Sequence, residues 1–164
     1  MQIQLMYMHT SMRASRQPRK TLRADAHAVL ETCAGWHTRL AARRITQFLE
    51  REMAGCSLGL AQFGLMAQIA GASDDTLGAL AERAGLDQST LSRNLRTLEG
   101  EGLIEIAAVE TDLRRRAVWL TEAGARRLEA AIPAWRKAHA KLARRLSPAL
   151  ARQLADEAEA LSEA

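Results

Sequence analysis

The spacing of apolar residues predicts long helices at both ends of the chain. From Asp25 to about Met53 the apolar side chains recur every three or four residues, which is the pattern of one stripe on a long amphipathic helix. The same period returns after Thr121 and continues into a last helix that begins at Ser147-Pro148. We expect that last helix to bury the apolar side chains of its own stripe, which are Leu150, Leu154, Ala158 and Leu161.

The middle of the chain predicts three shorter helices. The first runs over residues 60–70, and the second ends at Ala84 with Asp75 as its expected N-cap. Gly85 can adopt the left-handed conformation that ends a helix. Asp87 then caps a third helix that runs to about Glu99 and turns three leucines inward, namely Leu91, Leu95 and Leu98.

Two short β-prone runs follow the third helix. They are Leu103–Val109 and Ala117–Leu120, and the polar, basic segment Glu110–Arg116 separates them. Two such runs predict a β-hairpin with a long loop, and we call this hairpin the wing. The predicted fold is therefore mainly α with a small β-hairpin wing.

The order of these elements predicts a winged helix-turn-helix domain between two helical segments. The winged domain spans residues 56–121, and the segments 25–55 and 122–164 form a helical dimerisation region. Helices rich in Leu and Ala at both ends have no sheet to cover them. A chain of this size gains burial by pairing with a second copy, so we expect a homodimer.

The basic charge of the chain is concentrated at its start. The 164 residues hold 23 Lys and Arg against 19 Asp and Glu, a net charge of +4. Five of the basic residues and no acidic residue lie within residues 1–24, which leaves 18 basic and 19 acidic residues in the remainder. We therefore expect a basic, disordered N-terminal arm over 1–24 on a near-neutral body, and the net charge alone does not indicate DNA binding.

Several functional classes are excluded by the composition. Two cysteines, Cys33 and Cys56, do not suffice for a disulfide-rich scaffold or a four-cysteine zinc site. No apolar run approaches the roughly 18 residues that span a bilayer, so we expect a cytoplasmic protein with no membrane contact. Phosphate-binding glycine loops and the usual zinc-protease and hydrolase motifs do not occur, and four dispersed histidines do not indicate zinc. The sequence predicts a protein that is not an enzyme and has no cofactor or metal.

The third helix of the middle region carries a polar face suited to DNA. Its positions outside the leucine stripe are Gln88, Ser89, Thr90, Ser92, Arg93 and Arg96. An α-helix fits the major groove of double-stranded DNA, and an arginine can bond the O6 and N7 atoms of guanine or a phosphate. The sequence does not separate these two roles. A solvated face is the alternative, but the helix before it and the hairpin after it favour DNA recognition.

The predicted loop of the wing carries a run of positive charge. Three adjacent arginines, Arg114, Arg115 and Arg116, repel one another in solution, and a narrow minor groove attracts inserted arginine. Asp112 can orient the guanidinium of Arg114 by a hydrogen bond. The alternative is a solvated charge run with local ion pairs to Glu110 and Asp112.

Together these segments resemble one family of bacterial regulators. The run Leu80–Arg93, with Leu98-Glu99 and Gly102-Leu103-Ile104, resembles the MarR family of transcriptional regulators. The segments Asp112-Leu113-Arg114 and Val118–Gly124 extend the similarity, which covers about residues 30–162. The resemblance implies an obligate homodimer whose recognition helices enter successive major grooves of a pseudo-palindrome, with wing arginines in the flanking minor grooves. It further implies a repressor that a small, often aromatic or phenolic, ligand releases from DNA.

The resemblance also implies where that ligand binds. Relatives bind it between the first helix, the second helix and the long helix after the wing. The positions here that suit such a pocket are Trp36, His37, Leu40, Phe63, Met66 and Trp135. The alternative is that the aromatic residues belong to the core or to the dimer interface.

Cys33 suggests an alternative regulatory mechanism, in which oxidation of a cysteine replaces ligand binding. Its place on the first helix is similar to that of the reactive cysteine in organic-peroxide sensors of the family. Those sensors support the thiolate with tyrosines, whereas the one tyrosine here, Tyr7, lies in the arm. The alternative function is thus a repressor switched by oxidation of Cys33, and the plainer interpretation is a small buried cysteine.

Overall fold

The computed structural model describes residues 20–72, 76–109 and 112–162, and the chain divides into two units, 1–42 and 43–164. The first unit contains α1 (Lys20–Thr32) and the start of α2 (Ala34–Glu52). The prediction of one long helix from Asp25 is therefore wrong. Residues 20–24, which we assigned to the arm, are helical, and residues 1–19 of the arm lie outside the described residues.

The helix is interrupted at Cys33. The hydroxyl of Thr32 donates to the carbonyl of Ala28 at 2.8 Å, and Gly35 follows the interruption. A hydrogen bond from a side chain to the helix backbone weakens a helix locally, and so does a glycine residue. Together they explain the break. The predicted apolar stripe is not buried within this unit, because Val29 is 60% exposed and Trp36 is 53% exposed.

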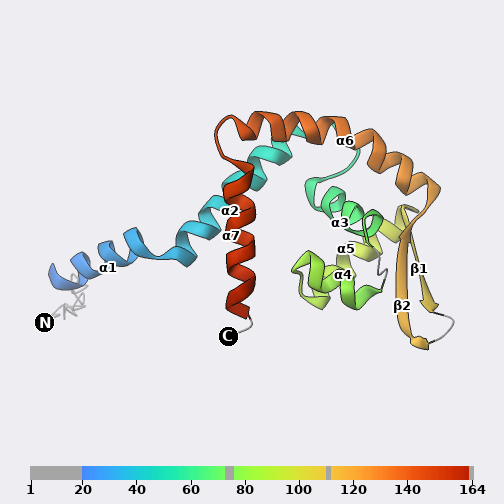
Figure 1. The fold of residues 1–164 in the computed structure, drawn as a ribbon, viewed down its shortest axis with the longest axis horizontal. Coiled ribbons are helices and arrows are strands. Elements are labelled where there is room, and N and C mark those ends of the chain that lie inside the picture. Colours follow the sequence, from blue (N-terminus) through green and yellow to red (C-terminus); the bar gives the residue numbers. More distant parts are fainter. Residues whose placement is uncertain (1–19, 73–75, 110–111, 163–164) are drawn as a thin grey trace, which may run out of the picture. The chain divides into compact units, whose positions relative to one another are not determined.

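The second unit contains the remaining elements in the predicted order. Three helices, α3 (Leu60–Ala70), α4 (Leu77–Ala84) and α5 (Gln88–Gly100), precede the hairpin of β1 (Ile104–Val109) and β2 (Asp112–Leu120). The chain continues through α6 (Glu122–Ala143), α7 (Pro148–Glu159) and the short 3-10 helix η1 (Ala160–Ser162). Figure 1 shows α3, α4 and α5 gathered beside the two strands. The predicted mainly helical fold with a winged domain is confirmed.

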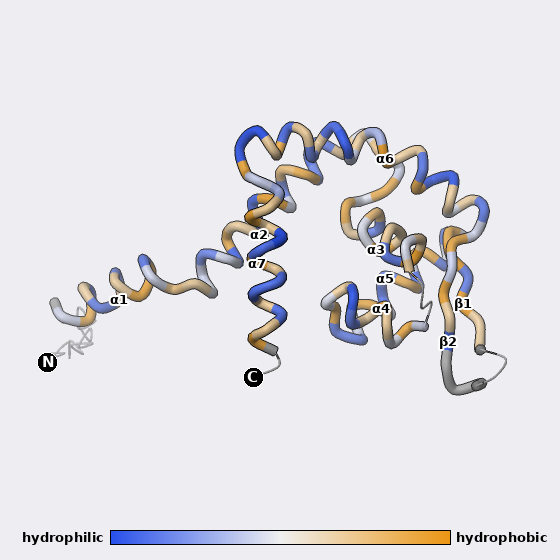
Figure 2. Tube along the Cα trace, in the orientation of Figure 1, coloured by the Kyte–Doolittle hydropathy of each residue, from blue (hydrophilic) through white to orange (hydrophobic). Residues whose placement is uncertain are grey.

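The core of the second unit lies where α3, α4, α5, the wing and α6 meet. Met66, Leu80 and Leu98 are fully buried, and each comes from a different helix. The three inward leucines predicted for α5 are all buried. Figure 2 shows polar and apolar positions alternating along α6, whose apolar side contributes Leu128 to this core.

The strands of the wing are antiparallel, and the second strand is longer than predicted. Ile104 pairs with Leu120, the ladder continues to Ala108 opposite Arg116, and a bulge follows. The segment that we expected to form a long loop therefore belongs mostly to β2, which begins at Asp112. Backbone pairing depends on the neighbouring strand more than on side-chain hydrophobicity, so the charged run did not reveal it.

The last helix differs from expectation in its burial. No residue of α7 is buried within the chain, and Leu150, Leu154 and Leu161 are 54%, 47% and 79% exposed. The apolar stripe predicted on α7 exists, but within the described residues of this chain nothing covers it.

Candidate nucleic-acid interface

Helix α4 is capped at both ends, and its C-terminal cap forms the turn to α5. The N-cap of α4 is Thr76, whose hydroxyl accepts from the backbone N–H of Ala79 at 3.4 Å, so our assignment of Asp75 is wrong. Asp75 itself lies outside the described residues. Gly85 ends α4 with φ of 59°, the left-handed conformation that glycine adopts at little cost. This turn joins α4 to α5 as a helix-turn-helix.

Asp87 caps α5 with its carboxylate, as predicted. Oδ1 accepts from the backbone N–H of Thr90 at 2.8 Å and from the hydroxyl of Ser89 at 2.6 Å. Oδ2 accepts from the hydroxyl of Thr90 at 2.8 Å. The Ser89 hydroxyl, followed by the two groups of Thr90, holds the pKa of Asp87 well below its usual range, because these bonds stabilise the ionised form.

The face of α5 opposite its buried leucines is polar and accessible. Gln88, Ser89, Arg93 and Arg96 are exposed, and Thr90 and Ser92 are half-buried. An open hollow on this face is lined by Gln88, Ser89, Ser92, Arg93 and Arg96. Neither guanidinium has a hydrogen-bond or ion-pair partner among the described residues. Five of the six predicted DNA-contacting residues of α5 therefore lie together on one open surface, and Thr90 is the one that does not line it.

The predicted charges of the wing are described only in part. Arg116 is exposed and lies opposite Ala108. The backbone of Asp112, Arg114 and Arg115 belongs to β2, but their side chains lie outside the described residues. The predicted bond between Asp112 and Arg114 consequently stays a prediction.

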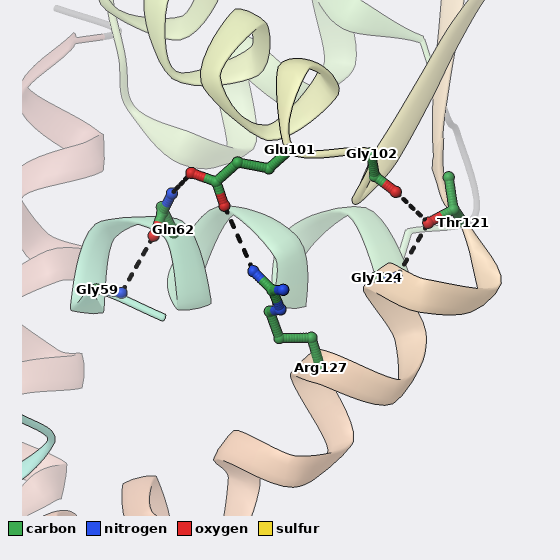
Figure 3. Close-up of polar contacts among 7 residues, drawn as sticks. All are labelled: Gly59, Gln62, Glu101, Gly102, Thr121, Gly124 and Arg127. Atoms are coloured by element: carbon green, nitrogen blue, oxygen red, sulfur yellow. Dashed lines mark hydrogen bonds and ion pairs between the residues drawn. The ribbon is translucent and has the colours of Figure 1, made fainter. Parts of the chain in front are cut away.

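Two hydrogen bonds of the Thr121 hydroxyl fix the wing to α6, and they were not predicted from the sequence. Thr121, the one residue between β2 and α6, donates its hydroxyl to the carbonyl of Gly102 at 2.7 Å. The same oxygen accepts from the N–H of Gly124 at 3.0 Å and so caps α6 (Figure 3). A Cβ on Gly124 would lie 1.9 Å from the carbonyl oxygen of Leu103, so this position admits only glycine. The run Thr121–Gly124 carries part of the family resemblance, but its role in packing was not visible in the sequence.

Glu101 forms a second missed connection, at the end of α5. Its Oε1 accepts from Nε2 of Gln62 in α3 at 3.2 Å. Its Oε2 lies 3.6 Å from Nη1 of Arg127 in α6 (Figure 3). Gln62 also accepts from the N–H of Gly59, at the start of α3. One carboxylate thus connects the C-terminal end of α5 to two other helices.

The ligand-binding candidates of the second unit lie in or against its core. Met66 is fully buried, and Phe63 stacks on Trp135 with ring centroids 5.9 Å apart. Trp135 also contacts the ring of His139 at 4.4 Å, and burial lowers the pKa of His139. His139 was not among the predicted residues, although its place one turn after Trp135 put it on the same helical face.

The predicted ligand-binding residues of the first unit are more exposed to solvent than those of the second. Trp36 is exposed, Leu40 is half-buried, and Nε2 of His37 lies 3.0 Å from the carbonyl oxygen of Glu31. Cys33 is a half-buried free thiol. Its carbonyl accepts from the N–H groups of Trp36 and His37, which places Cys33 at the beginning of α2.

Two features are absent from the described parts of the chain. Within them no helix is long and apolar enough to cross a membrane. The same residues contain no cluster of three or more His, Cys, Asp or Glu side chains able to hold a metal ion.

Comparison with known proteins identifies similar regulators. A family model described as the MarR family matches residues 57–115. The transcriptional regulator MosR of M. tuberculosis, solved in complex with DNA, is 32% identical to the chain. The alignment covers 80% of this chain and 97% of MosR, with a TM-score of 0.71. No curated protein sequence matches the chain.

More distant structures share the fold. A mutant MarR of E. coli in complex with operator DNA is 21% identical, with 81% of this chain and 96% of MarR covered at a TM-score of 0.68. PcaV of Streptomyces coelicolor, solved with its natural ligand, is 19% identical, with 82% and 95% covered at a TM-score of 0.67.

Proposed function

The chain belongs to the MarR family of transcriptional regulators, and we propose that it is a cytoplasmic, homodimeric repressor that binds a pseudo-palindromic operator and is released by a small aromatic or phenolic ligand. The observation that carries the proposal is the free polar face of α5. Arg93 and Arg96 project from a helix whose other side is anchored by buried leucines, and neither has a protein partner among the described residues. MosR, the regulator at 32% identity, was crystallised with DNA, which supports this role for α5.

The wing supplies the second part of the proposed interface. Arg114, Arg115 and Arg116 lie consecutively in β2, and arginine is attracted to a narrow minor groove. We expect them to flank each major-groove contact, with Asp112 orienting Arg114. Arg114→Ala should weaken binding with less change in sequence preference than a substitution in α5.

Operator binding tests the proposed role of α5. Arg93→Ala or Arg96→Ala should weaken binding to the operator by about 1–3 kcal/mol when the residue reads a base. Fluorescence anisotropy at fixed salt measures the loss. Arg144→Ala is the matched control, because it removes the same charge from an exposed position after α6. If both α5 variants bind like Arg144→Ala, α5 is not the reading helix.

The exposed apolar residues of the terminal helices support the dimer. Leu22, Val29 and Leu30 of α1 are each more than half exposed, and the stripe of α7 is exposed as well. A second copy that covers these helices recovers about 1.5–3 kcal/mol for each large apolar side chain that becomes fully buried. Leu154→Lys should shift the chain toward monomer in light scattering. Ala149→Lys, on another side of α7, should leave a dimer, and equal masses for both variants would contradict the proposal.

Release by an aromatic ligand is the regulatory part of the proposal. PcaV, a structural neighbour, was solved with its natural ligand, and Trp36, His37, Leu40, Phe63, Met66 and Trp135 are the proposed contacts here. Salicylate serves as a probe, with operator release measured by anisotropy. Trp135→Leu should weaken release, whereas Trp119→Leu on the wing should retain it. Equal release by both variants would remove Trp135 from the ligand site.

A thiol switch at Cys33 is the second candidate. The half-buried thiol at the beginning of α2 favours it, because helix N-termini are among the places where cysteines become reactive. Cumene hydroperoxide should release the wild type from its operator and should not release Cys33→Ser. Cys56→Ser, which removes the other free thiol, should respond like the wild type. An unresponsive wild type would exclude this switch.

A further inference from the structure

Two adjoining hollows lie beside α3, at the ends of the winged domain's other helices. The first has a volume of about 270 Å³ and is bounded by α3, by the turn after α4 and by α5. The second has a volume of about 320 Å³ and continues along α3 to the last turn of α4. Gly64 and Gln68 line both hollows, so together they form one groove, which we call the α3 groove. Its size suits a small molecule.

The side of α3 that faces this groove carries no charge. None of the 11 residues of α3 is charged, although Gly64, Ala67 and Gln68 are exposed. A surface helix ordinarily presents charged residues opposite its buried stripe, and a helix that is apolar all round is normally covered. The exposed side of α3 therefore has the composition of a covered surface rather than of one that faces water.

The first hollow combines apolar surface with two amide groups. Leu65 and Leu86 supply the apolar surface, and Gln68 and Asn94 line the same hollow. Asn94 is half-buried, and its amide has no hydrogen-bond partner among the described residues. A polar group that is withdrawn from water without a partner costs free energy, which a bound group with a matching donor or acceptor would recover.

The second hollow adds an unpaired positive charge. Arg83, in the last turn of α4, lines this hollow, and its guanidinium has no ion-pair partner among the described residues. Nε2 of Gln68 donates to the carbonyl of Arg83 at 3.5 Å, so α3 lies against the end of α4. A guanidinium matches the geometry of a carboxylate. The α3 groove thus offers apolar surface in one hollow and a cation in the next.

We propose that the α3 groove binds a small carboxylate with a flat apolar body. The body lies against Leu65 and Leu86, and the carboxylate pairs with Arg83. This site is separate from the effector site proposed above, because Phe63 lies five residues before Gln68 and so projects from a different side of α3. The groove also shares no lining residue with the hollow on the polar face of α5, so the carboxylate and DNA can be bound together.

Titration of the full-length protein with 2-naphthoate tests the proposal. The fused rings of this probe supply the apolar body, and its carboxylate supplies the charge. In proton–nitrogen NMR spectra, the backbone amides of Gly64 and Gly71 and the side-chain amide of Asn94 should shift with one common Kd. The neutral 2-naphthamide has the same rings and should bind about fivefold more weakly, which is the upper value for an ion pair that water can reach.

Two variants test the two parts of the groove. Gly64→Leu fills the part that both hollows share and should abolish binding. Nothing lies within 4 Å of an added Cβ at Gly64, so α3 should form, and circular dichroism checks this. Arg83→Gln should weaken binding of 2-naphthoate about fivefold and leave that of 2-naphthamide unchanged. Arg144→Gln removes the same charge from an exposed position outside the groove and should bind both probes like the wild type.

The possible results separate this inference from the proposed function. Signals of Gly64, Gly71 and Asn94 that stay in place overturn the inference, and shifts confined to Trp135 would assign the probe to the proposed effector site instead. Wild-type binding by Gly64→Leu excludes the groove as the site. Equal affinity for the two probes, or equal behaviour of Arg83→Gln and Arg144→Gln, excludes a carboxylate as the ligand. A chain that binds 2-naphthoate here but binds no DNA would contradict the proposed function alone.

Discussion

We expect the substitution Gly124→Ala, which adds a single methyl group, to lower the stability of the folded protein. Gly124 lies in the first turn of α6, where its missing Cβ makes room for the carbonyl of Leu103. In Gly124→Ala the new carbon would be 1.9 Å from that oxygen and 2.9 Å from its carbon. Carbon and carbonyl oxygen ordinarily approach to about 3.3 Å, so one backbone must move by more than an ångström.

The displaced groups are those that fasten the wing. The carbonyl of Leu103 also accepts from the N–H of Thr121 at 3.1 Å, and the N–H of Gly124 donates to the Thr121 hydroxyl. Overpacking costs about 1–3 kcal/mol, and a lost cap adds about 1 kcal/mol. The higher helix propensity of alanine returns about 1 kcal/mol. We expect a net loss of about 1–3 kcal/mol, or a Tm lowered by about 2–12 °C.

Urea denaturation followed by circular dichroism at equal protein concentration measures this loss. Gly64→Ala is the control, because Gly64 lies inside α3, is exposed, and has no atom within 4 Å of an added Cβ. That variant should be as stable as the wild type or up to about 1 kcal/mol more stable. If Gly124→Ala unfolds like Gly64→Ala, the close approach of α6 to Leu103 does not exist in solution.

Three further predictions concern the same domain. Thr121→Val should lower the free energy of unfolding by about 2 kcal/mol, because it removes a cap and a hydrogen bond to Gly102, and Thr121→Ser should restore most of it in the same urea titration. Glu101→Ala should cost less than about 1 kcal/mol, since its contacts are solvent-exposed, and a larger loss would show that the carboxylate does more than the geometry indicates. Because burial lowers the pKa of His139 in the folded chain, the unfolded chain binds a proton first as pH falls, so stability declines from about pH 6.5 downward; a midpoint above about 6.5 in an NMR titration of His139 would contradict this sign.

Elements encoded by neighbouring residues were predictable from the sequence. The bounds of α3 agree with the prediction, Asp87 caps α5, and Gly85 has the expected left-handed conformation. These features depend on periodicity, capping and glycine, which act within a few residues. The polar face of α5 could be read for the same reason, since a helix with one leucine stripe must present its other side to solvent.

Features that depend on distant partners were not predictable. Glu101 contacts Gln62 across 39 positions of sequence, and nothing near either residue indicates the other. The start of β2 at Asp112 follows from pairing with β1, so the charged segment gave no sign of it. The stripe of α7 was predicted correctly as a pattern, but burial needs a facing surface that the described residues of this chain do not provide.

Because a single residue separates β2 from α6, the wing lies at the moving end of a lever whose arm is α6. Because Thr121 is hydrogen-bonded to Gly102 and is the one residue between β2 and α6, the wing and α6 must rotate together. At 1.5 Å per residue the 22 residues of α6 span about 33 Å. A tilt of about 5° around the C-terminal end of α6 therefore carries the wing about 3 Å, which exceeds the tolerance of a hydrogen bond. If a ligand releases the protein from DNA as proposed, a tilt of α6 by a few degrees about its C-terminal end would be enough to displace the wing.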